Sequence, residues 1–179
     1  MKKSGFTLLE ILVSVGILAT VAILITQVLF TTTHVNKKTV ILADIKQNGN
    51  FTLDVVSRMV RSAARIETSC DGTVTTPSAQ IRNADDTVTV LTCVSDGTVA
   101  RIASVSGTGT VSYLSGGTVT LSASGRSDCS DSSLQFSCPP TSGIPRQMTI
   151  TFTLGQAGFS GSAYENGSAS FSGTIGLRN

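Results

Sequence analysis

The longest apolar stretch of the chain lies near its start. Between Ile11 and Thr33 there are 23 consecutive residues without a charged side chain, and the part that reads ILVSVGILATVAILI is almost wholly apolar. Since about 20 such residues span the roughly 30 Å hydrocarbon core of a bilayer, the pattern predicts a membrane-spanning helix. A buried helix of a soluble protein is the less favoured alternative, because such a helix is seldom apolar on every face for five turns.

The helical pattern continues beyond this stretch. No proline occurs between Thr31 and Ile66, and Gly49 is the only weak point for a helix there. One side of this helix carries charges at spacings of 4, 3 and 4, namely Asp54, Arg58, Arg61 and Arg65. Another side carries the apolar residues Val56, Met59, Val60, Ala63 and Ile66. We therefore expect one helix from Phe6 to Ile66, half membrane anchor and half spine of a globular head.

From Thr73 onward apolar and polar residues alternate, which is typical of strands with one buried face. Glycines separate the alternating stretches and predict turns between them. The expected strands are 87–91, 98–102, 110–114, 118–121, 134–138, 147–154 and 169–177. An antiparallel meander is the simplest arrangement of such strands. The predicted fold class is α+β, a long N-terminal α-helix packed on an antiparallel β-sheet head.

Composition narrows the range of functions. The 179 residues include 24 Ser and 25 Thr but only 13% charged residues, and the length excludes a large multi-domain enzyme. The formal net charge of +2 is too small to indicate nucleic-acid binding by itself. A basic surplus lies in residues 37–65, where Asp54 and Arg58 are expected to pair on a solvated helix face. Lipid headgroups, DNA or an acidic neighbour are less favoured partners of this segment.

The flanks of the apolar stretch predict its orientation. Lys2 and Lys3 precede it, so the positive-inside rule places the N-terminus in the cytoplasm and the rest outside, which Lys37 and Lys38 oppose weakly. A secretory signal peptide is the next alternative. Its hydrophobic region usually has about 7 to 15 residues followed by small residues at the cleavage site, whereas this run is longer and ends in Phe30 and four polar residues.

The first ten residues carry the most specific signal. A short basic leader ends in Gly5, Phe6 follows, and Glu10 is the fifth residue after the glycine. A carboxylate this far inside an apolar segment costs about 2 to 3 kcal/mol or more in a bilayer, so Glu10 needs a partner. The segment resembles the cleavage and methylation segment of type IV pilins and their relatives, which include minor pilins and the pseudopilins of type II secretion systems. The resemblance covers mainly residues 1–30.

In that family a membrane aspartic peptidase removes the leader after the glycine and methylates the new N-terminal residue. The resemblance therefore implies cleavage after Gly5 and N-methylation of Phe6. Removing Lys2 and Lys3 leaves eleven basic and eleven acidic side chains. We expect the α-amino group of Phe6 in one chain to pair with Glu10 of its neighbour, which would specify the register of packed subunits. The alternative is that Glu10 lies at the level of the cytoplasmic headgroups.

Family members often carry a proline at the twenty-second mature position, where this chain has Gln27. The mid-helix kink of the family is therefore in doubt for this chain, while the motif before it is intact.

The four cysteines are Cys70, Cys93, Cys129 and Cys138, all beyond the apolar stretch and thus on the oxidising side. They contain no Cys-x-x-Cys pair and the only histidine is His34, so a metal site is disfavoured and disulfides are expected. Three connectivities are open to four cysteines. We favour Cys70 with Cys93 and Cys129 with Cys138, because the second pair closes a short loop that enters a strand.

The residue inventory argues against an enzyme. Serine, cysteine and zinc hydrolases mostly use a histidine, and His34 lies far before the head. The paired carboxylates Asp85 and Asp86 lie in a polar turn with Asn83, where they are more often solvated than catalytic. Neither a catalytic residue nor a cofactor is expected.

The resemblance implies a structural subunit, a minor pilin or pseudopilin, of a type IV pilus or a type II secretion-like filament. The implied partners are the membrane, the prepilin peptidase, other pilin or pseudopilin subunits and the filament assembly platform. The implied location is the cytoplasmic (inner) membrane, as a single-pass protein with its head outside, and then a cell-surface or periplasmic filament. Two alternatives remain, a lone signal-anchored surface binding or adhesion protein and a DNA-uptake subunit of a competence pilus. DNA as a partner has only the basic residues in its support.

We expect four segments along the chain. These are a cytoplasmic leader (1–5), a transmembrane helix (6–33), a helical spine (34–66) and a β-rich globular head (67–179).

Overall fold

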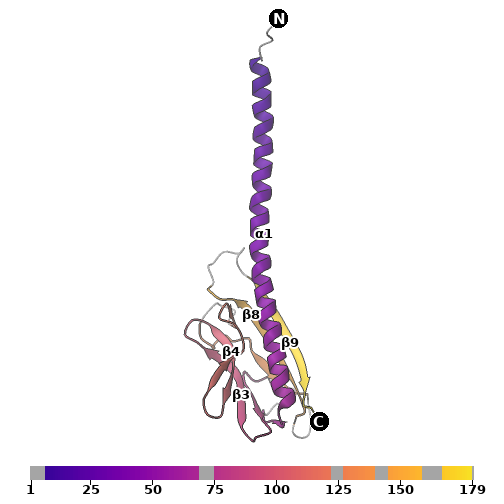
Figure 1. The fold of residues 1–179 in the computed structure, drawn as a ribbon, viewed down its shortest axis with the longest axis vertical. Coiled ribbons are helices and arrows are strands. Elements are labelled where there is room, and N and C mark those ends of the chain that lie inside the picture. Colours follow the sequence, from indigo (N-terminus) through magenta and orange to yellow (C-terminus); the bar gives the residue numbers. More distant parts are fainter. Residues whose placement is uncertain (1–6, 69–74, 122–126, 140–144, 159–166, 179) are drawn as a thin grey trace. The chain divides into compact units, whose positions relative to one another are not determined.

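The protein, seen in a computed structural model, is described over residues 7–68, 75–121, 127–139, 145–158 and 167–178, without the side chain of His34. It divides into two compact units, Met1–Thr39 and Val40–Asn179. Helix α1 runs from Leu8 to Ser62 and contributes to both units (Figure 1). All strands belong to the second unit, which we call the head unit, and all pair antiparallel within the described residues. The fold class is α+β, as the sequence predicts.

The expected helix is four residues too long at its end, and at its start Thr7 is not helical, while Phe6 lies outside the described residues. Thr7 precedes the first helical residue, and α1 ends at Ser62 rather than Ile66. Beyond Ser62 the backbone N–H of Ala64 donates to Arg82 O, 2.7 Å away, instead of continuing the helical ladder. Residues Arg65–Ile66 then form strand β1. The apolar side of the helix is nevertheless buried as expected, with Val56 and Val60 inaccessible to solvent.

The first sheet is the predicted kind of meander. Its five strands lie in the order β1-β2-β3-β4-β5. After β1 they are β2 (Ala79–Arg82), β3 (Val88–Ser95), β4 (Ala100–Ser106) and β5 (Val111–Tyr113). The sequence predicts β3, β4 and β5 but not β1 and β2. Gly97 and Gly109 lie in the turns after β3 and β4 with φ of 91° and 84°, a conformation that suits glycine.

A second sheet contradicts the expectation of one continuous meander. Its strands are β6 (Val119–Thr120), β7 (Gln135–Ser137), β8 (Gln147–Gln156) and β9 (Ser168–Gly176). Strand β8 pairs with all three others, over nine residues in the case of β9. The chain therefore leaves the first sheet after β5 and starts a new one.

Polar side chains of α1 fix the segment at which the chain changes sheets. Asp44, Asn48 and Thr52 lie four residues apart and share one face of the helix. Asn48 Oδ1 accepts the N–H of Gly116 at 2.9 Å. The Thr52 hydroxyl donates to Leu114 O at 3.0 Å, and Asp44 Oδ2 accepts the Thr118 hydroxyl at 2.8 Å. Residues 114–118 are thus held against α1, which turns the chain away from the first sheet.

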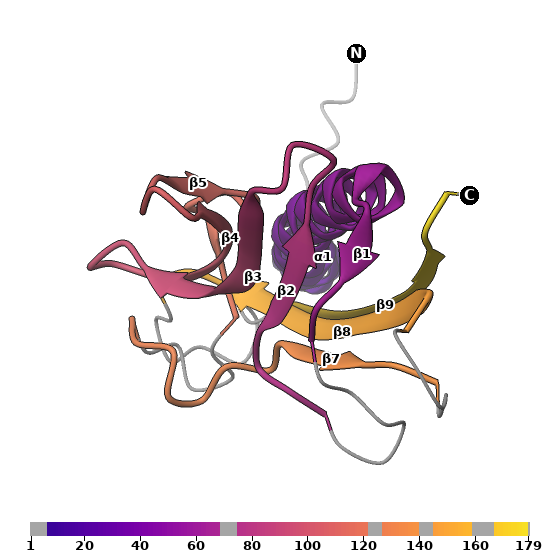
Figure 2. The same cartoon turned by 90° about the horizontal axis from the view of Figure 1, so that it is seen from below.

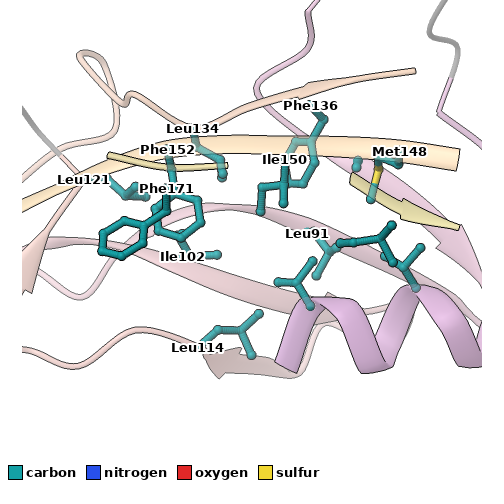
Figure 3. Packing of buried hydrophobic residues seen from close by; sticks show 14 of the residues in the cluster. Leu91, Ile102, Leu114, Leu121, Leu134, Phe136, Met148, Ile150, Phe152 and Phe171 are labelled. Atoms are coloured by element: carbon teal, nitrogen blue, oxygen red, sulfur yellow. The ribbon is translucent and has the colours of Figure 1, made fainter. Parts of the chain in front are cut away.

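The core of the head unit lies between the two sheets and the second half of α1. Along β8 every second side chain is buried, and these are Met148, Ile150, Phe152 and Leu154. Figure 3 shows side chains of β7, β8 and β9 directed toward Leu91 of β3 and Ile102 of β4. Seen along the helix axis, the second half of α1 lies beside β1 to β3 and against β8 and β9 (Figure 2). Strict alternation along β8 is what allows one of its faces to close this core.

The other face of β8 and β9 carries hydroxyl groups. Thr149 pairs with Thr174, Thr151 with Ser172 and Thr153 with Ser170, at 2.8, 3.3 and 2.8 Å. These cross-strand pairs stabilise the ladder. They also explain why a chain with few charged residues can keep a polar outer face.

Candidate assembly surface

The start of α1 is capped by Thr7. The N–H of Glu10 donates both to Thr7 O at 3.1 Å and to Thr7 Oγ1 at 3.3 Å, so Thr7 satisfies this helix donor with its carbonyl and its hydroxyl. Glu10 lies in the first turn and its side chain is exposed. A carboxylate in a first turn is favoured by the helix dipole. Gly5 and Phe6, the expected cleavage and methylation residues, lie outside the described residues.

The first half of α1 exposes its apolar side chains. The large hydrophobic residues from Leu8 to Phe30 are 47 to 81% exposed. This helix is long and apolar enough to cross a membrane, by length and composition. The helix is unbroken through Gln27, where the family often has a proline.

Hydroxyl groups within this apolar segment are satisfied by the helix itself. Ser14 donates to Glu10 O at 2.7 Å and Thr26 to Ala22 O at 2.8 Å. Thr20, Thr31, Thr32 and Thr33 make similar bonds to carbonyls three or four residues earlier. Since an unpaired polar group in hydrocarbon costs several kcal/mol, by the usual estimate of about 2 to 7, these bonds suit the segment to an apolar environment.

The second half of α1 packs closely against β9 and the residue before it. At each contact a glycine of one segment faces a large side chain of the other. Gly167 lies beside Ile41 and Ile45, and Gly173 beside Leu53. Between them the ring of Phe171 occupies the space that a Cβ on Gly49 would need. The sequence identified Gly49 only as a weak point of the helix. The structure shows that glycine is required there for close approach of β9.

The outer side of this second half keeps two exposed apolar side chains. Val40 is 69% and Phe51 57% exposed, on a helix whose opposite side is buried. The ion pair of Asp54 with Arg58, expected from the sequence, lies on the same exposed side at 2.9 Å. This side of the helix therefore presents both apolar and paired charged groups to solvent.

The disulfide pairing favoured from the sequence is wrong. Cys93 of β3 pairs with Cys129, with their Cα atoms 5.9 Å apart. Hydrogen bonding brings the two together, because the Ser95 hydroxyl near the end of β3 donates to Ser127 O. Cys138 is also in a disulfide, and Cys70 lies outside the described residues. Spacing along the chain could not reveal this pairing, which depends on where the loop 127–131 meets β3.

Acidic residues in the head unit serve its turns. The Thr98 hydroxyl and the N–H groups of Val99 and Thr98 hold the pKa of Asp96 well below its usual range, and Arg101 adds to the effect. Thr87 similarly lowers the pKa of Asp85, which lies in the polar turn predicted from the sequence. These carboxylates accept hydrogen bonds from neighbouring turn residues, which is a structural use.

The carboxylate of Glu67 links strands β1 and β2 through one arginine on each strand. Glu67 accepts hydrogen bonds from Arg82 at 2.6 Å and from Arg65 at 3.1 Å, and these lower its pKa in that order of importance. Among the described residues no group of three or more His, Cys, Asp or Glu side chains could hold a metal ion.

The sequence analysis did not identify several residues that hold the second half of α1 against the rest of the head unit. The polar ladder of Asp44, Asn48 and Thr52 could have been found from its spacing of four. Phe171 gave no local signal, because its role depends on β9 lying beside α1.

Comparison with known proteins finds one similarity. Residues 1–26 match the family model described as the prokaryotic N-terminal methylation motif, the leader signature of type IV pilin-like proteins. No curated protein and no solved structure gives a significant match. The motif implies processing by a prepilin peptidase and assembly into a filament, and the apolar helix behind it fits a membrane anchor.

Proposed function

We propose that this protein is a structural subunit, a minor pilin or pseudopilin, of a membrane-rooted filament. The observation that carries the proposal is the combination of the methylation motif with an apolar helix whose side chains stay exposed. Such a helix needs lipid before assembly and other helices after it. No catalytic role is proposed for any residue.

Processing comes first in this function. The prepilin peptidase cleaves after Gly5 and methylates Phe6, which keeps the apolar helix in the mature chain. Met1 or Lys2 at the N-terminus of the chain isolated from membranes would instead favour the lone signal-anchored protein. Mass spectrometry of that N-terminus distinguishes the two.

Assembly follows through α1. Glu10 pairs with the α-amino group of Phe6 in a neighbour, while the filament assembly platform lifts subunits from the cytoplasmic membrane. The exposed Phe51 and Val40 support contact between the second half of α1 and helices of neighbouring subunits. The head unit then lies outside the membrane, where disulfides persist.

The Glu10 side chain gives the sharpest test. Glu10→Leu should leave membrane insertion and cleavage intact, because it makes the segment more apolar and leaves the junction unchanged. Entry into filaments should fall sharply, since the neighbour's cation loses its partner at a cost of about 3 to 5 kcal/mol.

Glu10→Gln is the matched control, because it keeps shape and hydrogen bonding without the charge. It should give an intermediate ratio of subunit in sheared filaments to subunit in membranes. Wild-type ratios for Glu10→Leu would contradict the pairing.

A further inference from the structure

Strand β9 leaves one of its edges unpaired. It pairs with β8 and with no other described strand, over nine residues. The N–H of Gln156 donates to Gly167 O and that of Leu177 to Arg146 O, so the odd-numbered residues of this register bond toward β8. The even-numbered residues of β9 therefore direct their backbone N–H and C=O groups away from β8. Within the described residues these groups make no hydrogen bond.

This edge lacks the features that usually protect an edge strand from another chain. Such strands are commonly short, bulged, or interrupted by a charged residue or a proline. The described strands β1, β5, β6 and β7, which also pair with one strand each, have only two or three residues. Strand β9 reads SASFSGTIG, without charge or proline, and its register with β8 is continuous. Its even-numbered residues are all exposed, so the edge is open to a further strand.

The two faces of β9 predict the side chains that an added strand would carry. Ser172 and Thr174 belong to the outer hydroxyl face, where they pair with Thr151 and Thr149. Phe171 and Ile175 lie on the opposite, buried face. Neighbouring strands place like residues side by side on each face. We therefore expect hydroxyl and apolar residues to alternate along a segment that pairs with this edge.

Unpaired guanidinium groups lie at the end of the free edge. A depression of about 560 Å³, which we call the arginine basin, is lined by Arg58, Arg61, Ser62, Gly176, Leu177 and Arg178. Gly176 is the last residue of β9, so the basin and the edge meet. Arg58 pairs with Asp54 at 2.9 Å. Arg61 and Arg178 form no ion pair within the described residues, and both are exposed.

Carbonyl groups at the end of α1 already have partners other than these guanidinium groups. Basic side chains near a helix end often bond to its last carbonyls. Here Met59 O accepts the Ser62 hydroxyl at 3.0 Å, and Arg61 O accepts the backbone N–H of Arg178 at 3.3 Å. Guanidinium groups bind carboxylates in a planar, two-bonded geometry, so the basin is suited to an acidic side chain.

We propose that β9 binds an extended segment of a different protein as an additional antiparallel strand, with an acidic residue of that segment in the arginine basin. Antiparallel pairing continues the pattern of the described sheets and places the N-terminal end of the segment beside Gly176. Backbone hydrogen bonds along the edge supply affinity, and the basin fixes the register. The site goes beyond the proposed function, because it gives the head unit a partner other than like subunits.

A second copy of β9 fits this edge less well. The second half of α1 and β9 run in the same direction, since Gly167 lies beside Ile41 and Gly173 beside Leu53. Antiparallel pairing of two β9 edges would direct the two helices oppositely, which conflicts with the proposed function because its subunits share one membrane. Parallel pairing would bring two arginine basins together, where like charges repel.

Synthetic peptides added to the full chain in detergent test the proposal. The acidic peptide has an acetylated N-terminus, two aspartates and then alternating valine and threonine, and its matched control has asparagine in place of both aspartates. The acidic peptide should slow hydrogen exchange of residues 168–176, because their free N–H groups become bonded. The asparagine peptide should bind about tenfold more weakly. Arg61→Gln with Arg178→Gln should abolish this difference between the two peptides.

The backbone edge is tested separately from the basin. Ser172→Pro removes an N–H that points away from β8, which an edge strand tolerates, and should weaken the acidic peptide about tenfold or more. Ser172→Ala, the matched control, keeps that N–H and should bind as wild type does. Peptides with backbone N-methyl groups on alternate residues test the same bonds without changing the protein. Methylation of one alternate set should abolish binding and methylation of the other should not.

Three outcomes would overturn the proposal. These are unchanged exchange of residues 168–176 at millimolar acidic peptide, equal affinities of the acidic and asparagine peptides for the wild-type chain, and equal effects of the two methylated sets. A chain that dimerises without peptide, with residues 168–176 protected, would assign the edge to a second copy instead. Since peptide binding requires neither leader cleavage nor filament entry, failure of the proposed function leaves these measurements valid.

Discussion

The two halves of α1 place the same kinds of side chain in opposite surroundings. Ile23 in the first half is 59% exposed, whereas Ile45 in the second half is 1% exposed. Nothing in the helix backbone distinguishes them, because both lie within one unbroken helix. The head unit covers the second half, whereas the apolar side chains of the first half are exposed, and the proposed function assigns their cover to lipid and neighbouring helices. An apolar side chain without a cover is therefore informative about partners.

Polar groups show the same contrast. In the first half, hydroxyl groups donate to the helix that carries them. In the second half, Thr52 and Asn48 bind backbone groups far along the chain, at Leu114 and Gly116. Thr52 and Asn48 also bond to carbonyls of their own helix, so the second half adds tertiary contacts to the intrahelical bonds that both halves make. Three experiments test this division and a fourth tests a turn of the head unit, each measured on the full chain in detergent.

Truncating one isoleucine in each half should give the largest contrast. Ile45→Ala should lower the free energy of unfolding of the head unit by about 2 to 5 kcal/mol, because it removes buried methyl groups and leaves a cavity. Ile23→Ala, the matched control, should leave that free energy unchanged. Hydrogen exchange followed by mass spectrometry reports both. Equal effects from the two variants would contradict the division of the helix.

Removing a disulfide should affect only the head unit. The Cys93–Cys129 bond joins residues 36 apart in sequence, so replacing both with serine should cost about 2 to 4 kcal/mol of head-unit stability. Protection of the first half of α1 should not change. Peptide mapping without reduction checks the pairing itself. If four cysteines form two disulfides, it should also find Cys138 linked to Cys70, and four free thiols would refute both bonds.

The two helix glycines should respond differently to alanine. Gly49→Ala gains about 1 kcal/mol of helix propensity but forces the ring of Phe171 to move, which costs about 1 to 3 kcal/mol, so a net loss is expected. Gly16→Ala meets no atom within 4 Å and should cost nothing. Thermal unfolding of the head unit compares them. Stabilisation by Gly49→Ala would show that β9 does not need the close approach.

Acid should weaken the head unit through its turn carboxylates, with the smallest effect of the four. The pKa of Asp96 is lowered in the folded state, so its contribution is present above the unfolded value of about 4 and is lost as pH falls below it. Asp96→Asn should lower stability at neutral pH and converge with wild type in acid. Denaturant titrations at several pH values measure this. Parallel curves at every pH would refute the role of Asp96.

Local patterns were sufficient to predict much of this molecule. Strand β8 differs from its expected range only by two added residues, because its alternation is strict. Strand β1 was missed because Ile66 keeps helical spacing from Ala63. Strand β2 was missed because Ala79–Arg82 is short and not rich in branched or aromatic residues.

Features that depend on tertiary register could not be predicted. The change of sheets after β5 depends on side chains of α1, and the pairing of Cys93 depends on a loop beside β3. The N-terminal motif was readable because its residues lie together in one continuous segment, within residues 1–26. The hydrogen bond from the Arg178 N–H to Arg61 O could not be predicted in this way, since the two residues lie far apart in the sequence.

The interlock of α1 with β9 has a mechanical consequence. A pull along the second half of α1 must drag the ring of Phe171 past the backbone on either side of Gly49. Strand β9 is in turn held to β8 by nine register pairs. Tension along β9 loads these bonds in shear, so they resist together rather than open one after another. In force spectroscopy of the full chain, Phe171→Ala should lower the rupture force of the head unit, and an unchanged force would refute this load path.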